Sequence, residues 1–311
     1  MTQGAGGTPV KVRPGPHDSL RDIAGLKVGQ AADARVRSGV TVILPDIPCV
    51  MAVDVRGGGP GTRETEALDP TCLVHQFHAL ALAGGSVFGL DAAGAVADWL
   101  SARGRGLDLG PRAVPVVPAA ILFDLNNGGD KDWGSQSPYG ALAREACNSA
   151  AYDFAQGPVG AAFGANAGAR QGGMGSASAM LENGLIVAAL VAVNSFGEVL
   201  TRPPAEDIPL PKAPLVGLNT TIGLVATNAR LDKASAKRLA MMAHDGLARA
   251  IRPVHTPFDG DTLFALATAN WARPVAPLDL TVMGTMAADC VARAVLKAVE
   301  PAGHWQTGSK A

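Results

Sequence analysis

The chain has 311 residues, of which 48% are hydrophobic and 17% are charged, and its net charge is −1. This balance suits a well-buried globular core and excludes an intrinsically disordered chain. Acidic and basic residues are interspersed without the basic stripe that binds a phosphate backbone, and no apolar run reaches the roughly 18 residues that span a bilayer. We therefore expect neither a nucleic acid nor a membrane as a partner.

The start of the chain is rich in Gly and Pro and lacks the apolar segment of a secretion signal. We expect residues 1–20 to form a flexible arm, residues 21–311 to form a single domain, and the protein to be cytoplasmic. The cysteines have no C-x-x-C spacing, so we interpret each as a small buried hydrophobic residue and not as a disulfide partner or zinc ligand. They are Cys49, Cys72, Cys147 and Cys290.

In the first half of the chain, β-branched runs bounded by Pro and Gly alternate with Ala- and Leu-rich periodic segments. The runs predict strands, and the periodic segments predict helices. In chain order we expect strands at 39–44 and 49–55 paired as a hairpin, helices at 73–82 and 88–100, a strand pair near 114–124, and a helix at 139–151.

The second half contains a continuous apolar run, LIVAALVAV at 185–193, which is predicted to be a strand buried on both faces. A Pro-rich stretch at 202–214 is typical of an exposed linker. Beyond it we expect a strand at 222–227, an amphipathic helix from Asp232, a strand at 262–268 and a helix at 280–299. This order, without strict βαβ alternation, predicts an α+β fold with helix layers around a mixed sheet core.

Asn219 and Thr220 lie between the Pro-rich linker and a predicted strand. Thr220 is an ordinary strand-opening residue unless the peptide bond before it is cut. A cut would give Thr220 a free α-amine, whose pKa of about 7.7–8.0 allows it to take a proton from the weakly nucleophilic hydroxyl. This position is therefore a candidate self-cleavage site and a candidate nucleophile.

Two further positions carry polar side chains at strand ends. Asp259 and Asp261 flank Gly260 just before a predicted strand, and a turn at the glycine would let both carboxylates orient an amine; the alternative is a solvated Asp-Gly turn. Asn194 follows the buried run, where its amide could donate to an oxyanion or simply form a turn.

Other motifs are weaker. Ser86 fails the G-x-S-x-G pattern, because Phe88 occupies the position of the second glycine. The glycine cluster at 57–61 lacks a Walker ending, although its backbone could approach a substrate. No calcium-loop motif is present, and four histidines without metal-ligand spacing are interpreted as surface or helix-face residues, so we expect no metal and no cofactor. These are His75, His78, His244 and His255.

Several segments in a fixed order resemble the P1-family peptidases, the group of the D-aminopeptidases, the β-aminopeptidases and the nylon-oligomer (aminohexanoate-oligomer) endohydrolases. The resemblance runs from about residue 22 to residue 299, and NTTI with HTPFDGDTLFA (255–265) is especially similar to the nylon-oligomer enzymes. The other segments are VDVRGGGPGTRE (53–64), LAGGSVFGLDAAGAV (82–96), VPVVPAAILFDL (114–125), GGMGSAS (172–178), ALVAVNSFGEV (189–199) and NTTIGLVATNARL (219–231).

The resemblance implies a four-layer αββα sandwich of the N-terminal-nucleophile type. It also implies self-cleavage into an α chain (1–219) and a β chain (220–311) that stay associated, assembled as a homo-oligomer such as a tetramer of αβ units. Carried over to this sequence, Thr220 is the nucleophile, Asp259 and Asp261 are the acidic pair, and Asn194 is the oxyanion donor.

The same resemblance leads us to expect substrate contacts from Phe123, Ser86 and Tyr139. Two positions depart from the nylon-oligomer enzymes: Phe123 replaces a tyrosine, and Leu181 or a neighbour replaces a lysine. Both departures concern the substrate and the cleavage rate more than the core chemistry.

The resulting hypothesis is a self-cleaving amide hydrolase for small-molecule, short-peptide or oligoamide substrates. One alternative is an unprocessed relative that binds a small amide or amino compound without turning it over. A second alternative is a serine hydrolase that uses Ser86, Ser176 or Ser178.

Overall fold

A computed structural model describes residues 10–201 and 219–300 of the chain. Its larger sheet has six strands in the order β1-β12-β13-β15-β17-β4, and only β15 and β17 run parallel. The strands are β1 (Val12–Pro14), β12 (Gly173–Leu181), β13 (Ile186–Asn194), β15 (Thr220–Thr227), β17 (Thr262–Ala267) and β4 (Val50–Val55).

The second sheet has five strands in the order β2-β3-β6-β9-β5, in which β6 and β9 run parallel. The strands are β2 (Leu26–Asp33), β3 (Ser38–Pro45), β6 (Leu80–Ala83), β9 (Ala119–Ile121) and β5 (Thr62–Arg63). Three two-stranded pairs lie outside these sheets: β7 (Leu107–Asp108) with β8 (Ala113–Val114), β10 (Asn166–Ala167) with β11 (Arg170–Gln171), and β14 (Glu198–Val199) with β16 (Ile251–Arg252).

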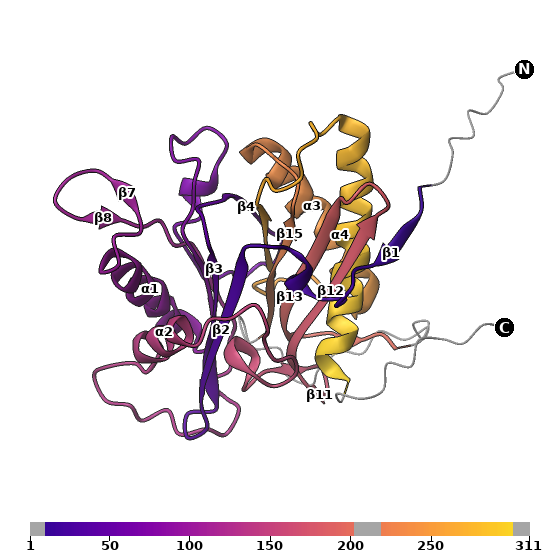
Figure 1. The fold of residues 1–311 in the computed structure, drawn as a ribbon. Helices are drawn as coiled ribbons and strands as arrows, with labels where there is room; N and C mark the ends of the chain where they lie inside the picture. The colour runs from indigo at the N-terminus through magenta and orange to yellow at the C-terminus, as the bar shows by residue number, and fades with distance from the viewer. Residues whose placement is uncertain (1–9, 202–218, 301–311) are drawn as a thin grey trace, which may run out of the picture.

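Helices cover the outer face of each sheet, so the molecule has four layers (Figure 1). Helices α3 (Lys233–Ala250) and α4 (Pro277–Val299) pack on the six-stranded sheet, and α1 (Asp91–Ser101) and α2 (Tyr139–Asn148) pack on the five-stranded sheet. The short 3-10 helices are η1 (Leu20–Asp22), η2 (Glu66–Leu68), η3 (Ser86–Leu90) and η4 (Gly160–Ala162). One apolar core lies between the sheets, and one lies under each helix pair. This arrangement is the mixed α/β sandwich expected from the sequence.

Strand β13 shows why the apolar run is continuous. Leu190 belongs to the core between the two sheets, whereas Val191 belongs to the core under α3 and α4. Because successive side chains of a strand point to opposite faces, a strand between two covered faces needs apolar residues at every position. The register of β13 with β15 then places Asn194 opposite Thr220 at the edge of the layers.

Three predictions about local structure were wrong. The strands near 114–124 do not form a pair: β8 pairs with β7, whereas β9 pairs with β5 and β6. Strands β3 and β4 do not form a hairpin: β3 pairs with β2 and β6, whereas β4 pairs with β17 in the other sheet. The Pro-containing segment between them carries the chain from one sheet to the other. The helix expected at 73–82 is absent, because Leu80–Ala83 is a buried strand whose four residues face covered layers on both sides.

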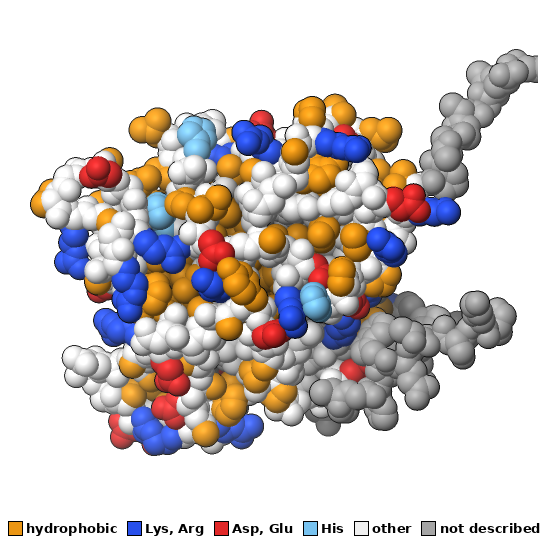
Figure 2. All heavy atoms as spheres, viewed as in Figure 1, with side chains coloured by type: hydrophobic (Ala, Val, Ile, Leu, Met, Phe, Trp, Pro, Cys, Tyr) orange, Lys and Arg blue, Asp and Glu red, His pale blue; other side chains and the backbone are white. Residues whose placement is uncertain are grey.

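The arm expected over residues 1–20 is part of the fold where the structure describes it. β1 pairs with the edge strand β12, and the side chain of Asp18 contacts both Arg293 and Lys297 of α4. The linker predicted at 202–214 lies outside the described residues. None of the helices in the described ranges is long and apolar enough to cross a membrane. On the face that Figure 2 shows, basic and acidic side chains are interspersed.

Candidate active site

Thr220 begins strand β15 and is 2% exposed. Its hydroxyl donates a 2.5 Å hydrogen bond to the carbonyl oxygen of Asn219, the residue before it. The backbone N–H of Gly260 donates to that carbonyl oxygen at 3.1 Å and also to the Thr220 hydroxyl oxygen at 3.2 Å. The bond between Asn219 and Thr220 is therefore held against the turn that contains Gly260.

The two aspartates on either side of Gly260 bind the backbone around this bond. Asp261 accepts a hydrogen bond from the N–H of Thr221 through Oδ1 at 2.7 Å. Asp259 accepts through Oδ2 from the N–H and the hydroxyl of Thr256, at 2.9 and 2.6 Å, and through Oδ1 from the N–H of Phe196 at 3.4 Å. Within the described ranges, neither carboxylate bonds directly to the Thr220 hydroxyl. The partners of the pair are backbone groups and the side chains of Thr256 and His255.

Burial sets the electrostatics of the pair. Asp259 and Asp261 are 2% and 1% exposed, so both carboxylates have lost most of their hydration. Desolvation, followed by the negative charge of Asp261, raises the pKa of Asp259 to about 6. Such a shift is typical of two carboxylates that share a buried site.

Asn194 lies opposite Thr220 in the sheet and is buried. Its amide Nδ2 donates to the carbonyl oxygen of Phe123 at 2.8 Å, and its Oδ1 accepts from the N–H of Asn166 at 2.9 Å. These two contacts fix the orientation of the amide and leave its second N–H without a described partner. The side chain can therefore donate one more hydrogen bond beside Thr220.

The glycine cluster at 57–61 packs on the acidic turn. The N–H groups of Gly57 and Gly59 donate to the carbonyls of Asp261 and Asp259, at 3.3 and 2.7 Å. A Cβ atom on Gly57 would lie 2.3 Å from the Asp259 carbonyl oxygen, so a side chain here would push the turn away. The glycines thus permit close backbone packing against the acidic turn, and Gly59 and Gly61 also line a cavity beside Thr220, where backbone close to a substrate was considered from the sequence.

A cavity of about 470 Å³ opens at Thr220. Phe123 and Ser86 are part of its wall, as expected for substrate-contacting residues. Tyr139 is not: its ring is fully buried beneath this region, and its hydroxyl donates to Ser38 at 3.1 Å, so the expectation of direct contact is corrected to a supporting position. The complete lining is Gly59, Pro60, Gly61, Thr62, Ser86, Val87, Leu90, Ile121, Phe123 and Thr220.

Of the three serines considered as nucleophiles, Ser176 and Ser178 do not line this cavity. Ser176 and Ser178 are fully buried on β12, where their hydroxyls donate to Ala189 and Asp22. Ser86 has a left-handed backbone (φ 53°), and among the described residues no histidine or carboxylate forms a hydrogen bond with its hydroxyl.

Leu181 is buried at the end of β12 remote from Asn194 and Thr220, so it does not line the cavity.

Sequence reasoning missed two histidines. His255 lies 2.8 Å from Asp261 through its Nδ1 atom, and the ring of His244 stacks edge-on against it. Interpreting both as surface or helix-face residues was wrong for His255 and incomplete for His244, which is on a helix but buried. It was also wrong for His78, which is buried outside the helices and accepts a hydrogen bond from the N–H of Val116 at 3.1 Å. The HTPFDGD order was the available signal, because it places His255 and Thr256 one turn before the acidic pair.

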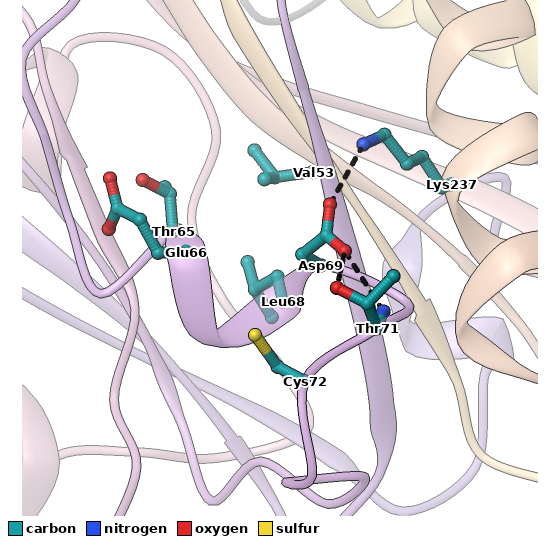
Figure 3. Close-up of a pocket in the computed structure, with 8 residues that line it drawn as sticks. All are labelled: Val53, Thr65, Glu66, Leu68, Asp69, Thr71, Cys72 and Lys237. Atoms are coloured by element: carbon teal, nitrogen blue, oxygen red, sulfur yellow. Dashed lines mark hydrogen bonds and ion pairs between the residues drawn. The ribbon is translucent and has the colours of Figure 1, made fainter.

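A second cavity, of about 450 Å³, lies between η2, strand β4 and helix α3 (Figure 3). Lys237 of α3 reaches Asp69 across it at 3.7 Å, and Cys72 forms part of its wall. Cys72 is half-buried, unlike Cys49, Cys147 and Cys290, which are buried as expected. No cluster of three or more metal-ligating side chains occurs within residues 10–201 and 219–300.

Comparison with known proteins connects this geometry to a family. The chain is 43% identical to an uncharacterized aminopeptidase of Mycobacterium tuberculosis, over 91% of this chain and 93% of the relative. It is 29% identical to the 6-aminohexanoate-oligomer endohydrolase of a Kocuria species, over 94% and 89% of the two chains.

Solved structures agree in fold. A Burkholderia β-aminopeptidase superposes with a TM-score of 0.71 at 25% identity, covering 93% of this chain and 88% of the other. An L-aminopeptidase D-Ala-esterase/amidase of Ochrobactrum anthropi, described as a variant of the Ntn hydrolase fold, superposes with a TM-score of 0.72 at 23% identity, with the same coverage. The resemblance stated from the sequence motifs is confirmed.

The family described as Peptidase family S58 matches residues 18–310. This match covers nearly the whole chain, and the relatives above are aminopeptidases and an oligoamide hydrolase by name. The protein therefore belongs to peptidase family S58 and is a peptide or amide hydrolase.

Proposed function

We propose that this hydrolase cuts its own chain between Asn219 and Thr220 and then uses Thr220 as the nucleophile toward amide substrates. The observation that carries the proposal is the contact of the Thr220 hydroxyl with the Asn219 carbonyl, with the Gly260 N–H bonded to both. A hydroxyl beside the carbonyl of its own peptide bond and a donor on the carbonyl oxygen are the two parts that an N-to-O acyl shift requires.

Self-cleavage would proceed in two steps. Thr220 Oγ1 attacks the Asn219 carbonyl carbon, the C–N bond breaks, and the nitrogen takes up the hydroxyl proton, which leaves an ester between Asn219 and the threonine oxygen. Water then hydrolyses this ester, giving a carboxylate on Asn219 and restoring the hydroxyl. The new α-amine of Thr220 is next to that hydroxyl in the same residue.

Turnover of substrate would use this amine as the general base. With a pKa of about 7.7–8.0 in the absence of neighbours, it is partly neutral near pH 7 and can accept the hydroxyl proton, as a lysine amine with a pKa of about 10.4 cannot. Asp261 accepts a hydrogen bond from the N–H of Thr221, and Asp259 pairs with Asn219 in an isolated parallel β-bridge. Both carboxylates would therefore flank the amine of Thr220. Their charge would help to position its protonated form.

The negative oxygen of the tetrahedral intermediate needs donors that are already in place. In self-cleavage the Gly260 N–H occupies such a position on the Asn219 oxygen. We assign the remaining N–H of Asn194 to the same task, because its amide is fixed beside Thr220 by Phe123 and Asn166. Losing one donor of this kind typically lowers turnover about 10²–10³-fold.

The cavity at Thr220 supports an uncharged acyl group as the part of the substrate it accepts. Among the described residues that line it, none carries a charged side chain, and the polar groups are hydroxyls such as those of Thr62 and Ser86. A charge without a partner would be costly to bury here. Relatives named as an aminopeptidase and as an aminohexanoate-oligomer hydrolase support peptides or oligoamides as the class of substrate.

The test is the intact mass of the purified protein. Two fragments that meet between residues 219 and 220 support the proposal, and a full-length chain that persists in an active preparation overturns it. Ser86 remains a second candidate nucleophile only because it lines the same cavity. Ser86→Gly separates the two, since glycine accepts the left-handed backbone of this position: loss of amide hydrolysis in S86G would favour the serine.

A further inference from the structure

We propose that His255 is a positioning residue whose ring holds Asp261 and, through Asp261, the start of the strand that carries Thr220. The inference rests on the proposed function of Thr220. His255 does not contact the Thr220 hydroxyl in any described interaction, so its effect would pass through Asp261 alone.

The carboxylate of Asp261 bridges the histidine and the nucleophile's neighbour. Its Oδ2 accepts from the backbone N–H of His255 at 3.1 Å and lies 2.8 Å from Nδ1 of the same residue. Its Oδ1 accepts from the N–H of Thr221 at 2.7 Å. Each carboxylate oxygen therefore has its own partner, and rotation of the carboxylate would break the contacts with both His255 and Thr221.

The hydrogen-bond partners show which ring nitrogen of each histidine donates. Nδ1 of His255 faces a carboxylate oxygen and so donates to it, and Nε2 is buried without a described partner. His244 donates through Nε2 to the Asp54 carbonyl at 2.9 Å, and its Nδ1 is likewise buried without a described partner. Each ring is therefore held through one nitrogen.

His244 serves as the wall that keeps the His255 ring in place. The ring centroids are 4.9 Å apart in an edge-on arrangement. Burial lowers the pKa of His244 to about 4, although the Asp54 carboxylate lies 3.7 Å from its Nε2 and Asp261 is nearby. An uncharged His244 contributes packing without competing for the Asp261 carboxylate.

The backbone of His255 is unusual in a way that favours this role. Its φ of +55° lies in the left-handed region, which residues with a side chain seldom adopt and which persists where the surrounding structure holds it. In this conformation the N–H and the ring nitrogen of one residue both reach the same oxygen of Asp261. A turn that used only the backbone N–H of His255 would not require its imidazole ring.

Two substitutions separate the ring from the backbone. His255→Gly keeps the left-handed conformation and the N–H but removes the ring, whereas His255→Asn tolerates the same conformation and can present an amide N–H near the place of Nδ1. His75→Gly, at an exposed position, is the control. The measurement is the rate of splitting at residue 219 in freshly made full-length protein, followed by mass.

We expect H255G to split about 10–100-fold more slowly than the wild type. A hydrogen bond to a charged carboxylate is stronger than one between neutral groups, so its loss should be visible in the rate. H255N should recover most of the rate, and H75G should match the wild type. A wild-type rate in H255G, or an H255N variant as slow as H255G, would overturn the positioning role.

If the wild type does not split at all, the proposed function fails, and the His255 contact is then tested on its own. Urea unfolding of H255G, Asp261→Asn and the double variant gives the coupling between the two residues. At least a fivefold coupling in the unfolding constant supports the contact. Additive effects of the two substitutions would contradict it.

Discussion

The backbone N–H of Gly260 donates to the carbonyl oxygen of Asn219 at 3.1 Å, and the hydroxyl of Thr220 donates to the same oxygen at 2.5 Å. The same N–H lies 3.2 Å from the Thr220 hydroxyl oxygen. The turn between the two aspartates therefore contacts both groups of the bond proposed to break. Gly260 is required for this approach, because a Cβ atom would lie 2.8 Å from the Thr220 hydroxyl and from the Gly59 carbonyl.

Gly260→Ala should slow splitting of the chain by about 10–100-fold, since the turn must move back and its N–H leaves the Asn219 oxygen. Splitting is followed by mass in freshly made protein. The matched control is Gly140→Ala on α2, where the added Cβ meets its nearest neighbour at an ordinary 3.8 Å. Equal rates in both variants would remove Gly260 from the account.

Asn194→Asp should lower the splitting rate by about 10²–10³-fold, because it replaces the amide donor beside Thr220 with an acceptor. Asn228→Asp is a close control. The Asn228 amide also donates to a carbonyl, that of Gly184, and accepts from a backbone N–H, that of Ile186, but at the other end of β13. Both variants should lose stability in urea unfolding, and only N194D should lose the reaction. Equal losses of rate would reduce Asn194 to a structural residue.

The pH dependence should follow Asp259. Its charged form accepts three hydrogen bonds, so protonation as the pH falls through about 6 should weaken them and lower the rate. The contribution of Asp259 to the stability of the fold should change with pH in the opposite direction to the rate. Because the folded pKa of Asp259 lies above the ordinary value of 3.8, its contribution is fully present below pH 3.8 and is lost as the pH rises through about 6.

Urea unfolding of the wild type and Asp259→Asn between pH 4 and pH 7 checks this sign. The wild type should lose stability relative to D259N by on the order of 1–3 kcal/mol as the pH rises. A relative gain of the wild type over that range would mean that the folded pKa of Asp259 is lowered instead.

The uncharged wall of the cavity at Thr220 predicts a preference among substrates. Amides that differ only in the acyl chain should be hydrolysed with kcat/KM at least about 10-fold higher when that chain is neutral than when it carries a carboxylate, since an unpaired charge would be buried. Chromogenic amides with a common leaving group provide the measurement. Equal or reversed values would place the acyl group elsewhere.

The sequence predicted those parts of the fold that depend on local pattern. Strands β13, β15 and β17 and helices α3 and α4 occur close to their expected positions, because long apolar runs and 3.6-residue periods report burial directly. The pairing of the strands could not be predicted in the same way, because it depends on segments that lie far apart in the chain. Strands β3 and β4 are near neighbours in the chain yet belong to different sheets, and a short apolar run such as Leu80–Ala83 suits a helix or a buried strand equally.

At the candidate site, the sequence and its resemblance placed Thr220, Asn194 and both aspartates together, and the structure brings them to one end of the six-stranded sheet. It could not indicate which atoms they bind. Asn194 bonds to the carbonyl of Phe123, a backbone atom that every residue type would provide. The HTPFDGD order indicates that His255 lies close to the acidic pair, but its contact with Asp261 depends on a left-handed backbone that the residue types alone do not predict.

The most direct test of the account compares two adjacent threonines by intact mass. Thr220→Val and Thr221→Val each replace a hydroxyl with a methyl group of similar shape, and the Thr221 hydroxyl has no described hydrogen-bond partner. We predict that the wild type and T221V separate into fragments 1–219 and 220–311, whereas T220V remains one chain without amide hydrolysis. A wild-type chain that stays intact while hydrolysing amides, or a T220V chain that still splits at this bond, would contradict the central claim.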